Sequence, residues 1–268
     1  MNRFLSLWLS IAFFCCIAGC RAQNEPLIIL HTNDTHSQIE PFLQKNISMG
    51  GFLRREAFIR EERARHSNVL LFDAGDFSQG TPFFNVYKGY VEIYLMNKMH
   101  YNAVTLGNQE FDNGSAALAK RLQKANFSVV CANYLFHNKS LARQVKPYTI
   151  LRCDGLKIGI FGLTVDLTPL VSPEVMKDLT YLNPIEVAIQ TVAELKKQNC
   201  DMIICLSHLG YDDPVVNDRI IAKQVPDIDL IIGGHTHKFL SDTAYVGDTP
   251  IYQLKNKGGY IGEITITY

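Results

Sequence analysis

The chain has 268 residues, and its 26 lysines and arginines balance 26 aspartates and glutamates. A formal net charge of zero gives no bulk attraction for nucleic acid or for an anionic surface, so we expect no nucleic-acid partner. No repeat, low-complexity tract or linker interrupts the sequence, which favours a single domain.

The N-terminus has the pattern of a secretion leader. Arg3 is the lone charge before an apolar stretch from Phe4 to Ala18, which suits a signal peptide and is too short for a comfortable transmembrane helix. The stretch ends in Ile17-Ala18-Gly19-Cys20, which resembles a bacterial lipobox and implies cleavage before Cys20 and lipidation of that cysteine. The alternatives are an ordinary secretion signal and an uncleaved anchor.

The lipobox resemblance implies a location and an organisation. It places the protein in the bacterial cell envelope, lipid-anchored, in the periplasm or on the outer membrane; the non-acidic Arg21 favours the outer membrane. We expect a signal peptide at residues 1–19, a lipidated tether at 20–26 and one domain at 27–268. The 249 residues left after cleavage suffice for one large α/β domain and not for two.

Four cysteines remain beyond the leader and the lipidated position, and none has the spacing of a zinc site. Cys131 and Cys205 lie in apolar, strand-like runs, so we expect buried thiols there. An oxidising compartment would permit a disulfide among these two cysteines, Cys153 and Cys200, and the sequence leaves the pairing open.

The first half of the domain alternates strand-like and helix-like segments. Short apolar runs indicate strands, and apolar residues spaced among charges indicate helices. We expect strands at Leu27–Leu30, Val69–Phe72, Ala103–Leu106 and Ser128–Ala132, and helices at Phe52–Arg65, Val91–Met99 and Ser115–Lys124.

The second half begins with a hairpin signal and a capped helix. Asp154-Gly155 predicts a turn between strands Tyr148–Arg152 and Lys157–Leu163. Asn183 predicts a helix N-cap, with Pro184 at the first helical position and Glu186 in the first turn. The apolar stripe of this helix comprises Ile185, Ala188, Ile189, Val192 and Leu195.

The remaining strands complete a mixed second half. Met202–Leu206 and Ile228–Ile232 are expected to be buried strands, and Tyr252–Leu254 with Tyr260–Tyr268 a closing antiparallel pair around Gly258-Gly259. A βαβ half followed by a mixed half indicates two sheets packed face to face with helices outside.

Five polar blocks each directly follow a strand-like run. The carboxyl ends of strands are where α/β folds place ligands. The blocks supply carboxylate, amide and imidazole groups, with glycines that allow tight turns. They are Asp34-Thr35-His36, Gly75-Asp76, Gly107 to Asp112, Ser207-His208 and Gly233-Gly234-His235-Thr236-His237.

These groups suit a pair of divalent metal ions. Hydrolysis of a phosphate ester needs a nucleophile at neutral pH and positive charge near the phosphoryl oxygens, and two ions about 3.5–4 Å apart supply both. A shared carboxylate must bridge the ions, and Asp76 beside a glycine turn is the natural bridge. One such block alone would be a weak signal, whereas five in order predict a metal site.

The blocks resemble the calcineurin-like metallophosphoesterases, and more narrowly the N-terminal catalytic domain of secreted 5'-nucleotidases and UDP-sugar hydrolases, over about residues 27 to 268. The resemblance implies an α/β fold, a four-layer αββα sandwich of two mixed sheets, and two divalent ions such as zinc or manganese. It places one ion on Asp34, His36, Asp76 and His237, and the other on Asp76, Asn108, His208 and His235.

The other histidines receive no site role. His66, His100 and His137 are expected to be ordinary surface or core residues. The same holds for His31, although it adjoins the first block and contact with a ligand residue is the less favoured alternative. Asp73 is expected to brace its loop.

One position departs from the family pattern. Where the family has a histidine oriented by a later aspartate, this chain has Gln109, with Asp112 still in place. Glutamine can donate a hydrogen bond to a phosphate oxygen but cannot carry a charge or deliver a proton. General acid catalysis is worth about 10²–10⁴ in rate, so the change could cost about 3–5 kcal/mol of barrier.

The resemblance implies a hydrolase of phosphate esters, most simply of nucleotides, that uses a hydroxide activated by two metals. Secreted 5'-nucleotidases carry a C-terminal domain for the nucleoside, and we expect a separate chain to supply it here, or a substrate that is not a nucleotide. The alternatives are a cyclic nucleotide phosphodiesterase, a nucleotide-sugar pyrophosphohydrolase, or a weakly active metal-binding subunit that works with a nucleotide-binding chain.

Overall fold

The computed structural model describes residues 25–240 and 244–268. The predicted signal peptide, the predicted lipidation site Cys20 and most of the predicted tether lie outside the described residues. Within those two ranges, no helix is both long and apolar enough to cross a membrane.

The first sheet carries the N-terminal strands. Its order is β17-β1-β4-β5-β6-β8, parallel throughout except where β17 runs antiparallel to β1. The parallel register brings the carboxyl ends of β1, β4 and β5 to one edge. The bounds are β17 Gly262–Ile266, β1 Leu27–Thr32, β4 Val69–Asp73, β5 Ala103–Thr105, β6 Ser128–Val130 and β8 Val145–Lys146.

The second sheet carries the C-terminal half. Its order is β14-β16-β13-β12-β10-β9, with β15 paired to β16. Four central strands are parallel, and both edges are antiparallel, with the predicted hairpin at one edge and β14 at the other. The bounds are β14 Phe239–Leu240, β15 Tyr245–Val246, β16 Thr249–Leu254, β13 Leu230–Gly233, β12 Met202–His208, β10 Leu156–Thr164 and β9 Tyr148–Cys153.

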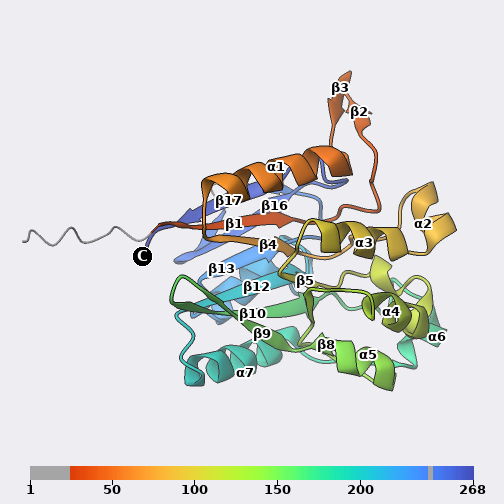
Figure 1. Ribbon diagram of the computed structural model, residues 1–268. Helices are drawn as coiled ribbons and strands as arrows, with labels where there is room; N and C mark the ends of the chain where they lie inside the picture. The colour runs from red at the N-terminus through yellow and green to blue at the C-terminus, as the bar shows by residue number, and fades with distance from the viewer. Residues whose placement is uncertain (1–24, 241–243) are drawn as a thin grey trace, which may run out of the picture.

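Three apolar clusters show that the fold has four layers. Alternate strand residues point to opposite faces, so Leu27 and Ile29 of β1 meet Ile204 and Leu206 of β12 between the sheets. The outer face of the first sheet packs on α1 (Phe52–Arg65), α3 (Tyr90–Lys98) and α4 (Gly114–Leu122). The outer face of the second packs on α7 (Pro184–Lys197) and α8 (Asp218–Gln224). The αββα sandwich is confirmed, and Figure 1 shows α1 and α7 on opposite sides of it.

The predicted N-cap of helix α7 is present, whereas one residue of the predicted apolar stripe of this helix is exposed. Asn183 Oδ1 accepts hydrogen bonds from the N–H groups of Ile185 and Glu186 at the start of α7. Ala188, Val192 and Leu195 are buried, but Ile189 is exposed. The reason is that Ile189 lies about 100° around the helix from Ala188, beyond the edge of a narrow buried stripe.

The predicted closing pair is wrong. Strands β16 and β17 form where expected, but they belong to different sheets: β17 pairs with β1, and β16 lies between β13 and β14. The segment around Gly258-Gly259 therefore crosses between sheets. Alternation of apolar residues identifies a strand but not its partner. Here β17 pairs with the N-terminal strand β1 and not with β16.

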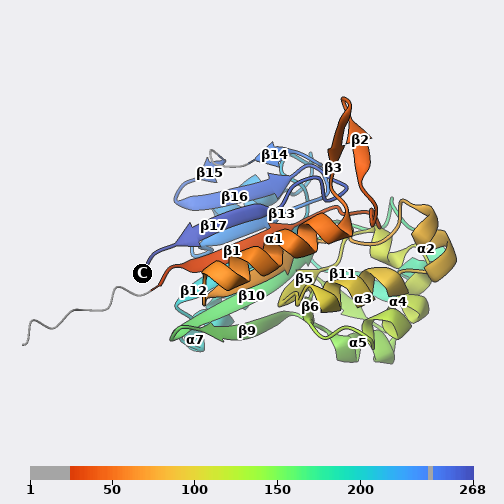
Figure 2. The same ribbon diagram turned by 45° about the horizontal axis from the view of Figure 1, so that its top comes forward.

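Several short elements were not predicted from the sequence. A hairpin of β2 (Phe42–Gln44) and β3 (Ile47–Met49) projects from the rest of the fold (Figures 1 and 2). The others include α8, β8, β14 and β15, given above, and α2 Pro82–Tyr87, the 3₁₀ turn Gln109–Phe111, α5 Lys139–Gln144, α6 Pro173–Met176 and the pair β7 Tyr134–Phe136 with β11 Leu179–Tyr181. All are short, so their periodicity is too weak to read.

The four described cysteines are free thiols. Cys131 and Cys205 are buried, as expected, while Cys153 and Cys200 are half-buried.

Candidate metal centre

The predicted ligand residues lie on loops with an unusual backbone. Asp34, His36, Asp76, His235 and His237 all have positive φ, between 47° and 71°. L-residues larger than glycine rarely adopt this conformation, and such strain concentrates at functional sites. Five of the seven predicted metal ligands share it, which is an observation independent of any family resemblance.

The first cluster joins the loop after β1 to the loop after β13. Asp34 Oδ1 lies 3.8 Å from His36 Nε2 and 3.4 Å from His237 Nε2. The two imidazole nitrogens lie 3.0 Å apart. One carboxylate and two imidazoles thus converge with a geometry that could hold a metal ion.

The second cluster comprises Asp34, Asp76 and His208. His208 Nε2 lies 3.3 Å from Asp76 Oδ2 and 4.0 Å from Asp34 Oδ1, and all three side chains are buried. Asp34 is common to both clusters. The bridging role that we predicted for Asp76 remains a prediction, and His235 lies beside His208 with ring centroids 5.2 Å apart.

Two unpaired atoms indicate that the donor set fits a metal ion. Asn108 Oδ1 and His208 Nε2 are buried, and neither makes a hydrogen bond within the described part of the chain. His208 Nδ1 lies 2.7 Å from the carbonyl oxygen of Ala74 and donates to it, which leaves Nε2 as the nitrogen that could face a metal ion. Buried polar atoms without hydrogen bonds are costly, and a cation held by these two side chains would give each atom a partner.

The carboxylates give the site a strong preference for positive charge. Burial disfavours the protonated form of His208, but Asp76 and Asp34 outweigh it and raise the pKa of His208 to about 10. A hydrogen bond to Asp34 likewise raises the pKa of His237. Burial lowers the pKa of the His36 imidazole despite the same carboxylates. A divalent ion would compete with protons for these nitrogens.

Glycines let the two ligand loops of the first sheet approach each other. A Cβ on Gly107 would lie 2.1 Å from Asp76 Oδ1, and one on Gly75 would lie 2.6 Å from the Gly107 nitrogen. Gln109 N–H donates to Asp76 Oδ1, which fixes this carboxylate oxygen. A side chain at either glycine would push Asp76 away from His208.

Gln109 is engaged with a metal-ligand candidate. Its Oε1 lies 2.6 Å from His36 Nδ1, so the amide oxygen accepts the Nδ1–H and leaves Nε2 free for a metal. The predicted partner Asp112 is exposed, and it makes no side-chain hydrogen bond to Gln109 in the described structure. Gln109 therefore positions His36. This role was not predicted from the sequence, which indicated only that a glutamine stands where the family pattern has a histidine.

Asn256 also contacts a metal-ligand candidate, but through its amide nitrogen. Asn256 Nδ2 lies 3.0 Å from His237 Nδ1. If His237 binds metal through Nε2, Nδ1 carries the proton, and the amide must present its oxygen. Nothing in the sequence singles out Asn256, because it lies 19 residues away on a different loop.

Glu110 is the main functional residue that sequence reasoning missed. Its Oε2 accepts the N–H groups of Asp76 and Gly107, and its Oε1 accepts the N–H and Oγ–H of Ser78. Burial raises the pKa of Glu110, but four donors that face it favour the carboxylate. Its place inside the third block was the available signal.

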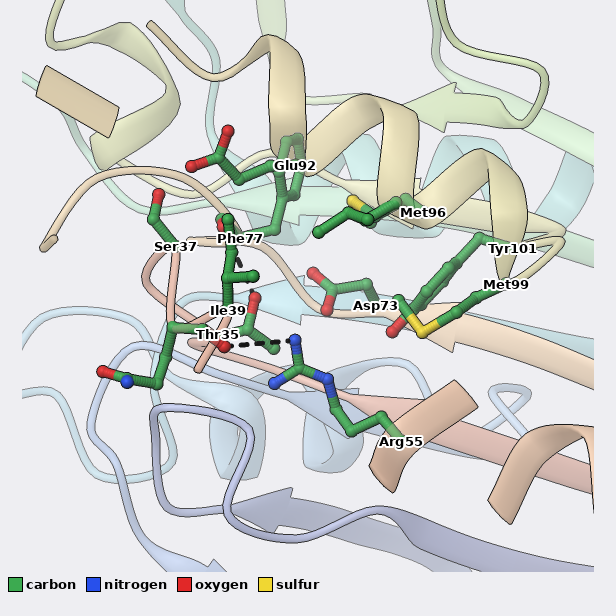
Figure 3. A pocket seen from close by; sticks show the side chains of 12 residues that line it. Thr35, Ser37, Ile39, Arg55, Asp73, Phe77, Glu92, Met96, Met99 and Tyr101 are labelled. Carbon is green, nitrogen blue, oxygen red and sulfur yellow. Dashed lines mark hydrogen bonds between the residues drawn. The ribbon is translucent and has the colours of Figure 1, made fainter. Parts of the chain in front are cut away.

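Asp73 braces its loop, as expected. It accepts hydrogen bonds from Thr32 Oγ1 and the N–H of Gly75, and Thr32 also contacts the Tyr101 hydroxyl. Burial raises the pKa of Asp73 to about 8. Asp73, Tyr101 and Arg55 line a small cavity of about 20 Å³. Figure 3 shows how these side chains lie. The hydrogen bonds of Asp73 connect the end of β1 to the loop that follows β4.

The ligand clusters open into a cavity of about 300 Å³. Asp76, Asn108, Gln109, His235 and His237 contribute to its wall. This size suits a small molecule. The site can therefore hold cations and a small anionic group at the carboxyl ends of strands from both sheets.

Comparisons with known proteins agree with this geometry. The family model described as calcineurin-like phosphoesterase matches residues 27–239. Snake venom 5'-nucleotidase from Crotalus adamanteus is 37% identical over 92% of this chain and 42% of its own length. This chain thus spans less than half of that relative.

Solved structures give the same picture. The 5'-nucleotidase precursor from Thermus thermophilus has a TM-score of 0.80 and 33% identity, over 91% of this chain and 51% of that one. The NAD nucleotidase from Haemophilus influenzae has a TM-score of 0.77 and 28% identity, over 90% of this chain and 52% of that one.

Proposed function

Since the chain belongs to the calcineurin-like phosphoesterase family, we propose that it hydrolyses phosphate esters with two bound divalent ions, as a 5'-nucleotidase-like enzyme. The observation that carries the proposal is the convergence of Asp34 with His36 and His237 on one side and with Asp76 and His208 on the other. Zinc and manganese suit this oxygen and nitrogen donor set.

Each side chain has a definite task in this proposal. Asp34, His36, Asp76, Asn108, His208, His235 and His237 hold the ions, which when bound supply a nucleophile at neutral pH and charge for the phosphoryl oxygens. Gln109 fixes the tautomer of His36 through Oε1. Its amide N–H groups are donors that can face a substrate phosphate. Asp112 is exposed, is not among the described residues that line the cavity, and is given no proton-transfer role.

The test is a hydrolysis screen on the metal-loaded protein. Nucleoside monophosphates, cyclic nucleotides, sugar nucleotides and 4-nitrophenyl phosphate are each supplied with added Mn²⁺ or Zn²⁺. We expect turnover of at least the aryl ester, and its loss with Asp76→Asn along with bound metal. Asp227→Asn, an exposed residue paired with Lys196, is the control. Absence of metal-dependent turnover on every substrate would refute the proposal.

A second candidate activity is favoured by Gln109. Cyclic phosphodiesters and pyrophosphates have leaving groups that need less protonation than an alkyl alcohol, and glutamine delivers no proton. The similarity to a protein described as an NAD nucleotidase is consistent with a pyrophosphate substrate. A screen in which sugar nucleotides or dinucleotides turn over faster than nucleoside monophosphates would favour this activity.

The location and the partner belong to the same proposal. We propose that Cys20 carries a lipid that anchors the enzyme in a bacterial envelope. We also propose that a separate chain supplies nucleoside binding. A Cys20→Ser form is expected in the soluble fraction or unprocessed. Wild-type protein that is soluble, with an unmodified Cys20 by mass spectrometry, would refute the anchor.

A further inference from the structure

The substrate cavity has a single fixed cation. Lys257 is the only lysine or arginine among the described residues that line it. The neighbouring lysines are not among the described residues that line it: Lys238 Nζ lies 3.0 Å from Asp212 Oδ2, and Lys255 Nζ lies over the Phe239 and Tyr260 rings. Lys257 is therefore the side chain that can bring a permanent charge to an anion in the cavity.

The turn that carries Lys257 is fastened to the metal centre. The Lys257 N–H donates to the carbonyl oxygen of Asp34 at 2.7 Å. Asn33 Nδ2 donates to the carbonyl oxygen of Lys255 at 2.8 Å, and Asn256 contacts His237. These contacts tie both ends of the turn to loops that hold candidate metal ligands. The position of Lys257 relative to the metal centre is thus determined by the fold and not by chance on the surface.

An aromatic contact restricts the position of the Lys257 ammonium group. Lys257 Nζ lies 5.9 Å from the centre of the Phe42 ring, at the base of the projecting β2–β3 hairpin. A cation over an aromatic face is attracted to it, which limits the conformations of an otherwise exposed lysine. Lys257 also has a φ of 59°, a conformation uncommon for lysine.

We propose that Lys257 contacts the non-bridging oxygens of the substrate phosphate and supplies the positive charge that Gln109 cannot. This inference rests on the proposed function. A phosphate monoester dianion at the metal pair gathers more negative charge as the ester bond breaks, and a fixed ammonium stabilises that charge. The substrate class it selects is a terminal, doubly charged phosphate in preference to a singly charged diester.

The experiment measures binding of inorganic phosphate to the Mn²⁺-loaded full chain by calorimetry, beside turnover of 4-nitrophenyl phosphate. The variants are Lys257→Gln, Lys257→Arg and the matched control Lys255→Gln. All keep the backbone N–H that bonds to Asp34. Metal content is measured for each by mass spectrometry.

We expect Lys257→Gln to weaken phosphate binding about tenfold at low salt, as for loss of one charge-assisted hydrogen bond. The deficit should shrink as ionic strength rises, because salt screens an exposed charge. Lys257→Arg should bind within about threefold of wild type, and Lys255→Gln should be unchanged. The hydrolysis of bis(4-nitrophenyl) phosphate, a monoanion, should fall less than that of the monoester.

Four results would overturn the inference. They are equal phosphate binding by wild type and Lys257→Gln, an equal loss in Lys255→Gln, loss of bound metal in Lys257→Gln, which would make its role structural, and wild-type protein that binds no phosphate. Wild-type protein that binds phosphate through Lys257 but hydrolyses no ester would refute the proposed function alone.

Discussion

At the scale of single residues, Gln109 has a structural role that differs from the catalytic role expected at its position. Its oxygen accepts a hydrogen bond from His36, which the metal site needs, while its place in the third block is where related enzymes carry a histidine. Asp112 remains exposed and its carboxylate is accessible to a new ring. The hydrogen bond from His36 to Gln109 positions a metal-ligand candidate, whereas an amide cannot transfer a proton.

Replacement of Gln109 by histidine tests that cost. At saturating metal, Gln109→His is expected to raise turnover of alkyl phosphates at least about tenfold, the low end of general acid contributions, and of aryl phosphates much less. A new pH limb should appear, because an imidazole titrates near neutrality and an amide does not. Metal affinity should fall, since His36 Nδ1 loses its acceptor.

The measurements are pH–rate profiles for an alkyl and an aryl ester and a metal titration. Gln109→Glu, which keeps an acceptor for His36, is the matched control and should retain metal affinity. Alkyl turnover that is unchanged or lower in Gln109→His would show that another group, such as Lys257, already fills the role.

Glu110 is a positioning residue that can be tested against a second buried acid. Glu110→Gln replaces one acceptor oxygen with a donor that faces N–H groups, so we expect metal affinity to fall about 10–100-fold and the free energy of unfolding to fall by about 2–4 kcal/mol. Glu92→Gln is the control, because Glu92 is also buried but holds no ligand loop. Its metal content should match wild type, and a similar loss in both variants would refute the positioning role.

The predictable and unpredictable parts of the site differ in how their signal is spread along the chain. The candidate ligands lie at the end of strands β1, β4, β5, β12 and β13 or within a few residues after them, so local patterns were enough to predict where they lie, while their metal-binding roles stay predictions. Asn256 and Lys257 were not predicted, because they reach the metal centre only where the chain crosses between sheets. Their contacts depend on the closure of the whole fold, which local patterns do not encode.

At the scale of elements, β1 shows how a central strand constrains its neighbours. Its predicted position was correct, but its pairing with β17 was not foreseen. His31 of β1 is fully buried, neither ring nitrogen has a hydrogen-bond partner in the described chain, and a Cβ on Gly262 of β17 would lie 2.0 Å from His31 Nε2. Burial lowers the pKa of His31 to about 3. The histidine is thus a core residue, as expected.

This burial makes a prediction about stability and pH. Because the folded pKa lies below the unfolded value of about 6.5, the unfolded state binds the proton first as the pH falls. His31 should therefore remove about 1.4 kcal/mol of stability for each pH unit below about 6.5, until the folded pKa is reached. His31→Leu should lose this component of the pH dependence.

Urea unfolding of the metal-free protein at pH values of about 7.5, 6.5 and 5.5, which span the unfolded pKa, measures it. His137→Gln changes an exposed histidine on a different element and is the control, so it should follow the wild-type profile. Parallel pH profiles for wild type and His31→Leu would show that His31 does not stay neutral in the folded state.

At the scale of the whole molecule, the two sheets bring their ligand loops to one end. The last residue, Tyr268, lies at the other end of the sandwich, beside the start of β1 (Figure 1). The cavity wall is polar, and no phenylalanine, tyrosine or tryptophan is among the described residues that line it. The cavity thus offers polar groups that suit an anion, and the 5'-nucleotidases from Crotalus adamanteus and Thermus thermophilus are about twice as long as this chain or longer.

The polar cavity leads to a prediction about the proposed partner chain. A polypeptide that binds the nucleoside and docks at the ligand end should lower the Michaelis constant for nucleoside monophosphates, because it adds binding energy remote from the phosphate. Since 4-nitrophenyl phosphate has no nucleoside, its Michaelis constant should change little. We expect at least about a tenfold difference between the two effects, measured by steady-state kinetics with the partner in excess. A pyrimidine and a purine monophosphate should both respond if the partner stacks on the base, whereas ribose 5-phosphate should behave like the aryl ester. An equal effect on all substrates would instead indicate that the partner acts on the metal centre itself, and no effect on any would refute assembly in trans.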